Sequence, residues 1–366
     1  MRPGHAIPMA SHEAVPGGEV LFEQPPTQYG ARPPGLIGFH ATDEAYARRF
    51  MTIVSRPYTN CPAERVMLYR DALVMDGRYV LSGGVAVADS YYNVPADAAQ
   101  LARQQAQLAR IAAGDIAALP EAGPPVVALF GQDCNNFGHL LAEMLPRLLH
   151  LPRVGITRLR LLVPAEAEAF RPMIDFALQA AGLEAETLAC PPGSILRVKA
   201  LHYVSLVGQG WFKSPTVLAL FERLRAAAPA RGAVERLFVA RPDSGRRRVA
   251  NAAEAAALAQ AMGFTVVEPS VLPFPEQVAL FAGARCVAGP FGAALTLIGA
   301  MPAGGHVGML SPGYYDTFYW DLACLAGHRF DWAFTAPVRP FDMALLEGEV
   351  MLPARQLRQV LARLER

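Results

Sequence analysis

The stretch that decides the fold class is Cys286-Val-Ala-Gly-Pro-Phe-Gly-Ala-Ala-Leu-Thr-Leu297, in which a short apolar strand pattern passes through small residues into a helical pattern. It lies in a longer segment, residues 286–315, that contains no Asp, Glu, Lys or Arg. An uncharged segment of this length could cross a bilayer. However, Pro290, Pro302 and Pro312 interrupt it. We therefore expect a strand, a tight turn and a helix buried inside a globular protein.

The same alternation of strand and helix extends in both directions from this stretch. Strands are predicted at residues 125–130, 158–163, 198–207, 236–240, 265–268, 286–288, 306–310 and 330–334. Helices are predicted at residues 137–150, 166–181, 215–228, 252–262, 276–284, 293–301 and 315–326. Repeated βα units of this length indicate parallel sheets with helices on both faces. We therefore predict an α/β protein with two parallel-sheet blocks and a ligand cleft between them.

The chain has 366 residues, which favours about two domains. The Pro- and Gly-rich residues 1–35 predict an extended or poorly ordered arm, followed by β-hairpins within residues 65–87 and a helix at 98–113. The expected division is an N-terminal domain at 36–228, a short linker, and a C-terminal domain at 233–340. A last helix at 353–366, with apolar residues on one face, is expected to pack back on either domain.

Composition excludes several classes of protein. The 33 basic and 32 acidic residues give a net charge of +1, which argues against binding nucleic acid through bulk charge. All basic residues except Lys199 and Lys213 are Arg. This skew reflects either the codon usage of a GC-rich genome or the suitability of the guanidinium group for binding phosphate. Five widely spaced cysteines argue against a disulfide framework or a structural zinc. The N-terminus lacks the apolar run of a signal peptide, so a cytoplasmic location is expected.

The first segment with candidate chemistry is residues 135–143, directly after a predicted strand. Asn136 can cap the helix that follows, and His139 and Glu143 lie at i and i+4 on one face. Glu143 could orient His139 or raise its pKa, as a general base requires. A purely structural His–Glu pair is the alternative.

The second segment follows the strand at 236–240. Arg241 stands at the strand end and Arg246–Arg248 in the loop, where guanidinium groups could bind a diphosphate. A solvated loop is the alternative for Arg246 and Arg247. Asn251, three residues before Glu254, resembles a helix-capping box, and capping is its expected role.

Two further segments begin helices. Glu276 could accept hydrogen bonds from a ribose, although its position in a first helical turn also fits the helix dipole. In Gly289-Pro-Phe-Gly-Ala293, small side chains would let a phosphate approach the backbone amides at a helix start. Close packing of helix against strand is the alternative for these glycines. Neither a dinucleotide fingerprint nor a P-loop is present.

Together, the order and spacing of these segments resemble the family 61 glycosyltransferases, which include enzymes of capsular polysaccharide biosynthesis. The family's Asn-Tyr-Gly-His-Trp-Leu-x-Glu pattern is similar to residues 136–143. Its strand ending in Arg, followed by Arg-Arg-x-x-Asn, is similar to Arg241 and residues 247–251. A Phe-x-Glu-Gln-x-x-x-Phe pattern is similar to residues 274–281, and Gly-Pro-His-Gly-Ala-Gly-Leu to residues 289–295.

The chain departs from the family pattern at several polar positions. Phe291 replaces the His of the glycine-rich loop, Leu297 stands where an Asn often follows Leu-Thr, and Met309 replaces the Glu of a Val-Ile-Glu-Leu pattern. These departures favour a different donor, a different donor geometry, or loss of activity.

The resemblance implies a GT-B-like fold, with two Rossmann-like domains facing a cleft. The donor nucleotide sugar would bind the C-terminal block, and the acceptor would bind the N-terminal block. It also implies an inverting, metal-independent hexosyl or pentosyl transfer that needs no cofactor besides the nucleotide-sugar substrate. The absence of an Asp-x-Asp motif from the sequence agrees with metal independence.

The resemblance also implies residue roles. His139 would be the catalytic base, supported by Glu143. The expected donor-binding residues are Arg241, Arg248, Glu276, Gly289, Phe291, Gly292 and Ala293, with Asn136 and Asn251 as further candidates. The acceptor would be a glycan or a lipid-linked glycan in cell-surface polysaccharide biosynthesis, and peripheral contact with the inner membrane or an assembly complex is left open. The alternative from another class is a catalytically silent nucleotide- or glycan-binding subunit of such a complex.

Overall fold

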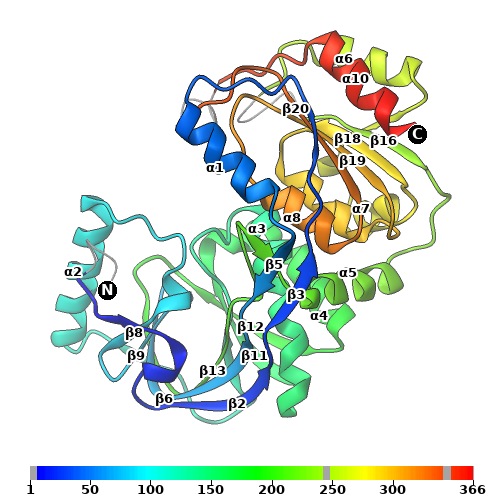
Figure 1. Ribbon diagram of the computed structural model, residues 1–366. Helices are drawn as coiled ribbons and strands as arrows, with labels where there is room; N and C mark the ends of the chain where they lie inside the picture. The colour runs from blue at the N-terminus through cyan, green and yellow to red at the C-terminus, as the bar shows by residue number, and fades with distance from the viewer. Residues whose placement is uncertain (1–5, 242–247, 341–347, 366) are drawn as a thin grey trace. The chain divides into compact units, whose positions relative to one another are not determined.

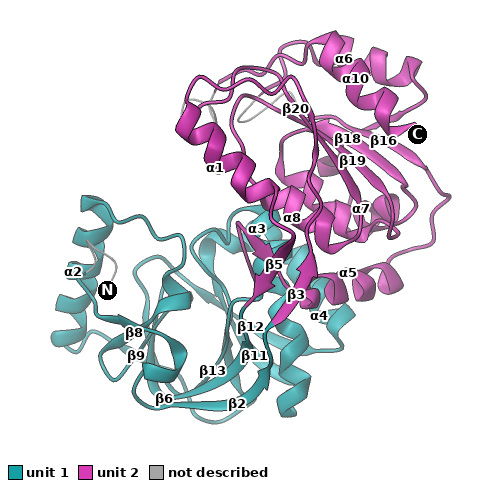
Figure 2. Cartoon of the chain, viewed as in Figure 1, with its two compact units in different colours: residues 1–26, 62–207 teal, residues 27–61, 208–366 magenta. Residues whose placement is uncertain are grey.

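The computed structural model describes residues 6–241, 248–340 and 348–365 (Figure 1). The chain forms two compact units, residues 1–26 with 62–207 (unit 1) and residues 27–61 with 208–366 (unit 2) (Figure 2). Each unit contains a sheet with parallel strands and helices connecting them. The predicted α/β class is therefore confirmed.

Unit 1 is built on a ten-stranded mixed sheet. Its parallel half has the order β13-β10-β11-β12, and an antiparallel half of β6, β7 and β8 joins it through β6. The strands are β1 (Met9–Ala10), β2 (Gly18–Gln24), β6 (Glu64–Met75), β7 (Tyr79–Ser82), β8 (Val85–Val87), β9 (Ala117–Ala118), β10 (Val126–Ala128), β11 (Arg158–Pro164), β12 (Glu184–Cys190) and β13 (Ile195–Val204).

The hairpins predicted within residues 65–87 are present. The β6–β7 turn has Asp76 and Gly77 at φ of 55° and 70°, and the β7–β8 turn has Gly83 and Gly84 at 56° and 78°. Two successive positive φ values match the right-handed twist of the flanking strands, which is why Asp-Gly and Gly-Gly occupy these turns. The first turn also orients Arg78, which the site uses.

Helices of unit 1 cover this sheet. They are η1 (His12–Ala14), η2 (Ala88–Tyr91), α2 (Ala98–Ala112), α3 (Phe137–His139), η3 (Leu140–Met144), η4 (Leu145–Val154), η5 (Ala165–Phe170) and α4 (Arg171–Ala181). The Asp97 side chain accepts a hydrogen bond from the amide of Gln100 and so fixes the start of α2. The core combines β-branched residues of β6, β10 and β13 with Tyr69 and Tyr203. The edge strand β12 was not predicted, because its alternating polar residues lack a continuous apolar run.

Unit 2 contains a six-stranded sheet in the order β17-β16-β18-β19-β20-β4, with every pair parallel. These strands are β16 (Arg236–Val239), β17 (Thr265–Val267), β18 (Cys286–Pro290), β19 (His306–Ser311), β20 (Arg329–Phe334) and β4 (Gly35–Ile37). The predicted strands at 236–240, 265–268, 286–288, 306–310 and 330–334 are all confirmed. The uncharged stretch is buried in this unit as β18, η7 (Ala293–Ala300) and β19, and no helix in the described part of the chain could span a membrane.

The N-terminal segment does not form the extended or poorly ordered arm expected at 1–35. Its described part carries β1 and β2 in unit 1 and β3 (Thr27–Gly30) and β4 in unit 2, and residues 1–5 lie outside the described residues. Helix α1 (Glu44–Val54) and strand β5 (Tyr58–Cys61) follow, and β5 pairs with β3. Phe50 of α1 lies edge-on to Trp332 and Phe334 of β20, which anchors this segment in unit 2.

The boundary expected after residue 228 also differs from the structure. Helix α5 (Pro215–Ala227) contacts α7 (Phe274–Ala282) and η7, so it belongs to unit 2, and the expected linker at 229–232 lies inside that unit. A Cβ atom on Gly299 would lie 2.3 Å from the ring of Phe221, so the glycine admits this aromatic ring of α5. The expected division into residues 36–228 and 233–340 separates α5 from its partners. Their packing could not be predicted from local patterns, because it joins residues about 80 positions apart in the sequence.

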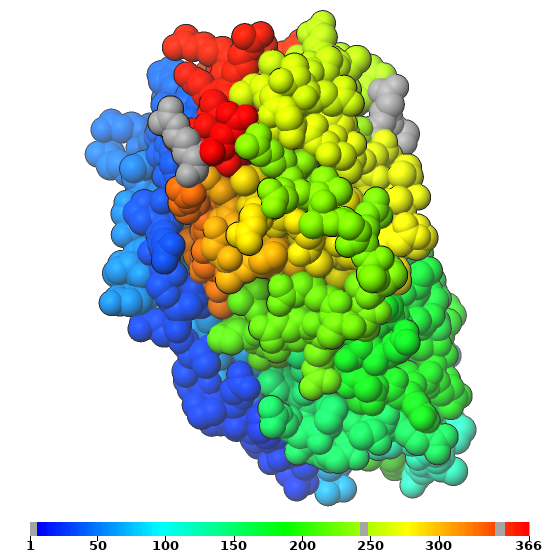
Figure 3. Space-filling model, turned by 90° about the vertical axis from the view of Figure 1, so that its right-hand side faces the viewer, coloured from blue at the N-terminus to red at the C-terminus, as the bar shows by residue number. Residues whose placement is uncertain are grey.

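The remaining elements of unit 2 are β14 (Gly208–Gln209), β15 (Phe212–Lys213), α6 (Ala252–Ala261), η6 (Pro269–Val271), α7 (Phe274–Ala282), η7 (Ala293–Ala300), α8 (Phe318–Leu325) and α10 (Ala354–Leu364). The predicted C-terminal helix is α10, which packs on β19 and β20 and lies beside α6 at the surface (Figure 3). Gly308 admits α10, since a Cβ there would lie 2.3 Å from Val360.

Candidate functional site

In unit 1, the first candidate segment emerges where the strand order reverses. From β10 the chain passes to β11 and β12 on one side, and then returns to β13 on the other side. Ligands of open α/β sheets bind at the carboxyl ends of the strands beside such a switch point. The loop after β10 leads directly into α3, which carries His139.

Side chains from the β6–β7 turn hold this loop in place. The Arg78 guanidinium donates to the carbonyl of Gln132 at 3.3 Å and to Sγ of Cys134 at 3.6 Å, and it pairs with Glu166 at 2.5 Å. The hydroxyl of Tyr79 donates to the side chain of Gln132. Burial raises the pKa of the Cys134 thiol to about 11, so this cysteine is a neutral packing residue. Sequence analysis missed Arg78, because its partners lie more than 50 positions away.

Asn136 begins the helix as predicted. Its side-chain oxygen accepts a hydrogen bond from the amide of Gly138 at 2.9 Å. Within this helix, Nδ1 of His139 lies 2.7 Å from Oε2 of Glu143, so the predicted i,i+4 contact is present. If Glu143 accepts from Nδ1–H, Nε2 carries the lone pair that a general base requires.

Exposure distinguishes this pair from the other His–carboxylate pairs of the described chain. The side chain of His139 is 23% exposed, and that of Glu143 is 3% exposed. The His side chains of the pairs at His12, His150 and His306 are only 8%, 4% and 10% exposed. A base must reach its substrate, and among these four histidines His139 presents the most surface to solvent.

The helix that carries the pair is not the regular α-helix predicted at 137–150. After α3 the backbone becomes a π-helix, η3, and then a 3₁₀-helix, η4. Pro146 has no amide hydrogen for the carbonyl four residues earlier, and Pro152 interrupts η4 again. Short π-helical segments occur often at functional sites.

A second arginine that was not predicted from the sequence, Arg147, forms hydrogen bonds that hold this helix in place. Arg147 is only 2% exposed, and its Nε donates to the carbonyl of Glu143 at 2.9 Å while Nη1 reaches the carbonyl of Val204 at 3.5 Å. It thus bridges the helix after β10 and the end of β13, the two sides of the switch point. The i+4 spacing puts Arg147 one turn after Glu143, and its side chain there reaches the backbone carbonyl of Glu143.

Unit 2 has a switch point of the same kind between β16 and β18. The chain leaves β16 for β17 on one side and returns to β18, β19 and β20 on the other. Arg241 follows β16, and its Nη1 donates to the carbonyl of Phe291 after β18 at 2.8 Å. A Cβ on Gly292 would lie 2.3 Å from that Nη1. The structure therefore brings together Arg241, Phe291 and Gly292, with Ala293 beginning η7.

The other residues of the expected donor site make different contacts. A Cβ on Gly289 would lie 2.9 Å from the carbonyl of Val239 in the neighbouring strand β16, so this glycine serves close packing of strand against strand and not of helix against strand. Arg248 pairs with Glu349, and Glu276 lies 3.8 Å from Arg231. Arg246 and Arg247 lie outside the described residues.

Asn251 does not cap its helix, in contrast to the expectation. It precedes α6 without a side-chain capping bond. Its side chain instead exchanges two hydrogen bonds with the backbone of Leu352, at 2.9 and 3.0 Å. The reason is the bridge between Val249 and Val350, which lines up these two segments.

A region of recognised similarity begins at α3, just after the switch-point loop of unit 1, and includes the switch point of unit 2. Residues 137–308 match the family model of glycosyltransferase 61. The matched range, a little under half of the chain, runs from the start of α3 into β19. The match makes this part of the chain similar to the glycosyltransferase 61 family. No curated protein matches the chain.

The departures from the glycosyltransferase 61 pattern occupy buried positions. Leu297 and Met309 are fully buried in unit 2. Phe291 is 8% exposed, and its ring lies edge-on to Tyr314 and Tyr319, with centroids 5.0 and 5.3 Å away. Each apolar replacement is thus accommodated by packing, and the backbone at Phe291 still receives Arg241.

Proposed function

We propose that this protein is an inverting glycosyltransferase of cell-surface polysaccharide biosynthesis. It would transfer a hexose or pentose from a nucleotide sugar to a hydroxyl of a glycan or lipid-linked glycan, in the cytoplasm. The observation that carries the proposal is the pair of switch points. The segments that follow β10 and β16 carry His139 and Arg241, which supports the proposed roles of these residues, and both residues lie within the family match. Two Rossmann-like blocks also support a GT-B-like arrangement.

The proposed reaction is a single displacement. Nε2 of His139 takes the proton of the acceptor hydroxyl, while Glu143 holds the imidazole through Nδ1. The acceptor oxygen bonds to the anomeric carbon as the bond from that carbon to the diphosphate oxygen breaks. The nucleoside diphosphate leaves with the electron pair of that bond, which inverts the configuration.

The leaving group would be stabilised in unit 2. The Arg241 guanidinium adjoins the turn at residues 289–293, so a diphosphate there would meet a cation and backbone amides together. Such a site supplies positive charge without a metal ion, and we propose metal-independent transfer. Arg248 and Glu276 remain donor-site candidates only if the donor reaches beyond this turn.

A silent nucleotide- or glycan-binding subunit is the second candidate. The observation that favours it is the aromatic packing of Phe291, which puts an apolar ring where the family pattern has a polar imidazole.

Nucleotide-sugar turnover separates the two candidates. The purified protein is screened against UDP-, GDP-, dTDP- and CMP-sugars by thermal shift, and then by release of free nucleotide with and without oligosaccharide acceptors. Stabilisation together with acceptor-dependent release supports the transferase. Stabilisation without release supports the silent subunit, and no stabilisation by any nucleotide sugar contradicts the proposed donor site.

A further inference from the structure

The hairpin formed by β14 and β15 presents an exposed aromatic ring. Gly208 pairs with Lys213 and Gln209 with Phe212, so Gly210 and Trp211 form the turn. Trp211 is 52% exposed, whereas Trp320 and Trp332, the other tryptophans of the sequence, are fully buried. Large aromatic rings normally gain stability by burial, so the solvent-facing indole of Trp211 contrasts with the two buried ones.

Side-chain donors fix the backbone of this turn. The ammonium group of Lys213 donates to the carbonyl of Gln209 and, at 3.3 Å, to that of Phe212. Thr317 donates to the carbonyl of Gly210 at 3.4 Å, and Arg56 to that of Trp211 at 3.1 Å. Four consecutive carbonyl groups, those of residues 209–212, therefore receive donors from side chains.

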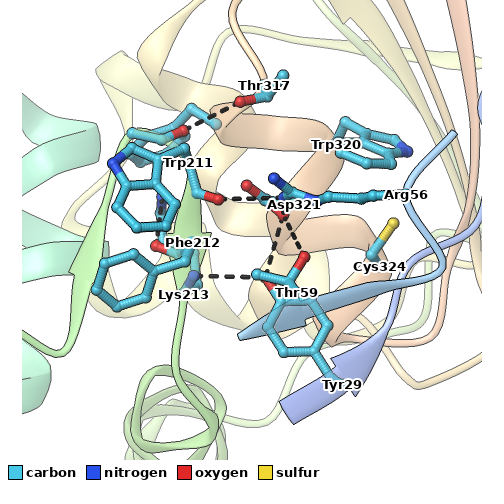
Figure 4. A network of polar contacts seen from close by, with 12 residues as sticks. Tyr29, Arg56, Thr59, Trp211, Phe212, Lys213, Thr317, Trp320, Asp321 and Cys324 are labelled. Atoms are coloured by element: carbon cyan, nitrogen blue, oxygen red, sulfur yellow. Dashed lines mark hydrogen bonds and ion pairs between the residues drawn. The ribbon is translucent and has the colours of Figure 1, made fainter. Parts of the chain in front are cut away.

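These donors belong to a buried polar network (Figure 4). The Asp321 side chain is fully buried, and its Oδ1 accepts from Arg56 and from the hydroxyls of Tyr29 and Thr59 at 3.1 and 3.2 Å. Burial raises the pKa of Asp321, and the cations Lys213 and Arg56 oppose that rise. Burying charges is costly unless their hydrogen bonds are well satisfied, so a buried ion pair is weak evidence of added stability. What the network does supply is donors to the backbone of the hairpin.

The position of the hairpin in unit 2 connects it with the proposed donor site. Thr317 and Asp321 lie at the start of α8, which follows β19 at the carboxyl edge of the sheet. The Lys213 ammonium lies 4.0 Å from the ring centroid of Phe318. Phe318 in turn contacts Tyr319, and Tyr319 contacts Phe291, whose carbonyl receives Arg241. A continuous set of contacts therefore links the hairpin to the turn where the donor diphosphate is proposed.

We propose that Trp211 is a stacking platform for a sugar ring of the acceptor glycan, an inference that rests on the proposed glycosyltransferase function. One face of a pyranose consists of C–H groups and packs against an indole, while its hydroxyls stay in water. In Figure 4 the carbonyl of Trp211 points toward Arg56 and its ring points away from Asp321, so the network holds the backbone and leaves the ring available. An acceptor must lie beside the donor, and the contacts through Phe318, Tyr319 and Phe291 connect the hairpin with the proposed donor turn.

Intrinsic fluorescence tests this platform, because Trp211 supplies the accessible indole. Acrylamide quenching is measured with cellohexaose, xylohexaose, chitohexaose and maltohexaose, each without nucleotide. We expect at least one of them to protect the wild-type protein from quenching. Calorimetry of that oligosaccharide with Trp211→Ala should show about tenfold weaker binding, with Trp211→Tyr in between. Met351→Ala, which removes an apolar side chain of similar exposure, 55%, should bind as the wild type does.

The outcomes separate the platform from the transferase. The platform is overturned if none of the four oligosaccharides changes the quenching. It is also overturned if Trp211→Ala binds the oligosaccharide with the same affinity as the wild type. Either result counts against the platform even where the protein binds and turns over a nucleotide sugar. Protection by nucleotide sugar alone overturns the assignment to the acceptor. Oligosaccharide protection of the wild type, together with weaker calorimetric binding by Trp211→Ala, supports the platform. If no nucleotide sugar binds, the transferase proposal fails while the platform stands.

Discussion

The switch points of the two units have the same topology but different chemistry. In unit 1, the strand at the reversal leads into a helix with an imidazole paired to a carboxylate, and the arginine there, Arg147, is buried against backbone carbonyls. In unit 2, the corresponding loops carry Arg241 beside Gly292. The first arrangement suits proton transfer, and the second suits anion binding. The shared topology fixes where a site forms, and the loop residues decide what it does.

The two switch points also share a departure from regular helix geometry. In unit 1 the helix after β10 contains π- and 3₁₀-turns, and in unit 2 the helix after β18 is the 3₁₀-helix η7. Pro146 and Pro152 account for the first, whereas Gly299 in the second admits Phe221. Substitutions at the two edges can test whether each has the role proposed for it.

The largest expected effect concerns the base in unit 1. His139→Ala should lower kcat by about 100-fold or more, because proton removal from the acceptor loses its catalyst. Nucleotide affinity should stay within about twofold, since the donor diphosphate is proposed to bind in unit 2. Turnover is measured by nucleotide release and affinity by calorimetry.

A matched control for this substitution is the buried pair of His150 and Glu64. His150→Gln should lower the melting temperature without a comparable loss of kcat in the folded protein, because that imidazole is 4% exposed. If His139→Ala keeps its kcat, or if His150→Gln loses as much, the distinction between the two pairs fails and the base lies elsewhere.

The next effect concerns the cation in unit 2. Arg241→Lys should weaken nucleotide binding by about 1–3 kcal/mol, roughly 5- to 150-fold, because an ammonium group lacks the planar fork of the guanidinium. Arg236→Lys, at the opposite end of β16 and paired with Glu365, is the control and should leave nucleotide affinity unchanged. Calorimetry with the nucleotide that stabilises the protein measures both, and equal affinities in the two variants would remove Arg241 from the donor site.

The fold was predictable where neighbouring segments pair. The strands and helices of residues 236–334 follow one another with βα periodicity, so apolar patterns located nearly all of them. The segment 27–61 was misassigned because its partners are distant in sequence, as when Ile37 of β4 pairs with Ala333 of β20. Local patterns carry no information about a pairing that spans nearly 300 residues.

The candidate site shows the same limit. The contact of His139 with Glu143 was predictable from helical spacing, and Arg241 from its place at a strand end. The partner of Arg248, Glu349, was not, because it lies 101 positions away. Trp211 carried no sequence signal, since its significance depends on donors from Arg56 and Thr317 on either side of it in the chain.

The smallest expected effects are changes in stability and kcat on substituting Asn136 and Asn251, the asparagines that precede helices in the two units. Asn136→Ala removes the cap on α3 and should cost about 1 kcal/mol of unfolding free energy, measured by urea denaturation. Because that cap begins the helix that carries His139, kcat should also fall a few-fold. Asn251→Ala should cost a similar free energy, through its lost bonds to Leu352, without lowering kcat. If kcat falls for Asn251→Ala and not for Asn136→Ala, the comparison is reversed. The segment at 248–251 would then contribute to the reaction.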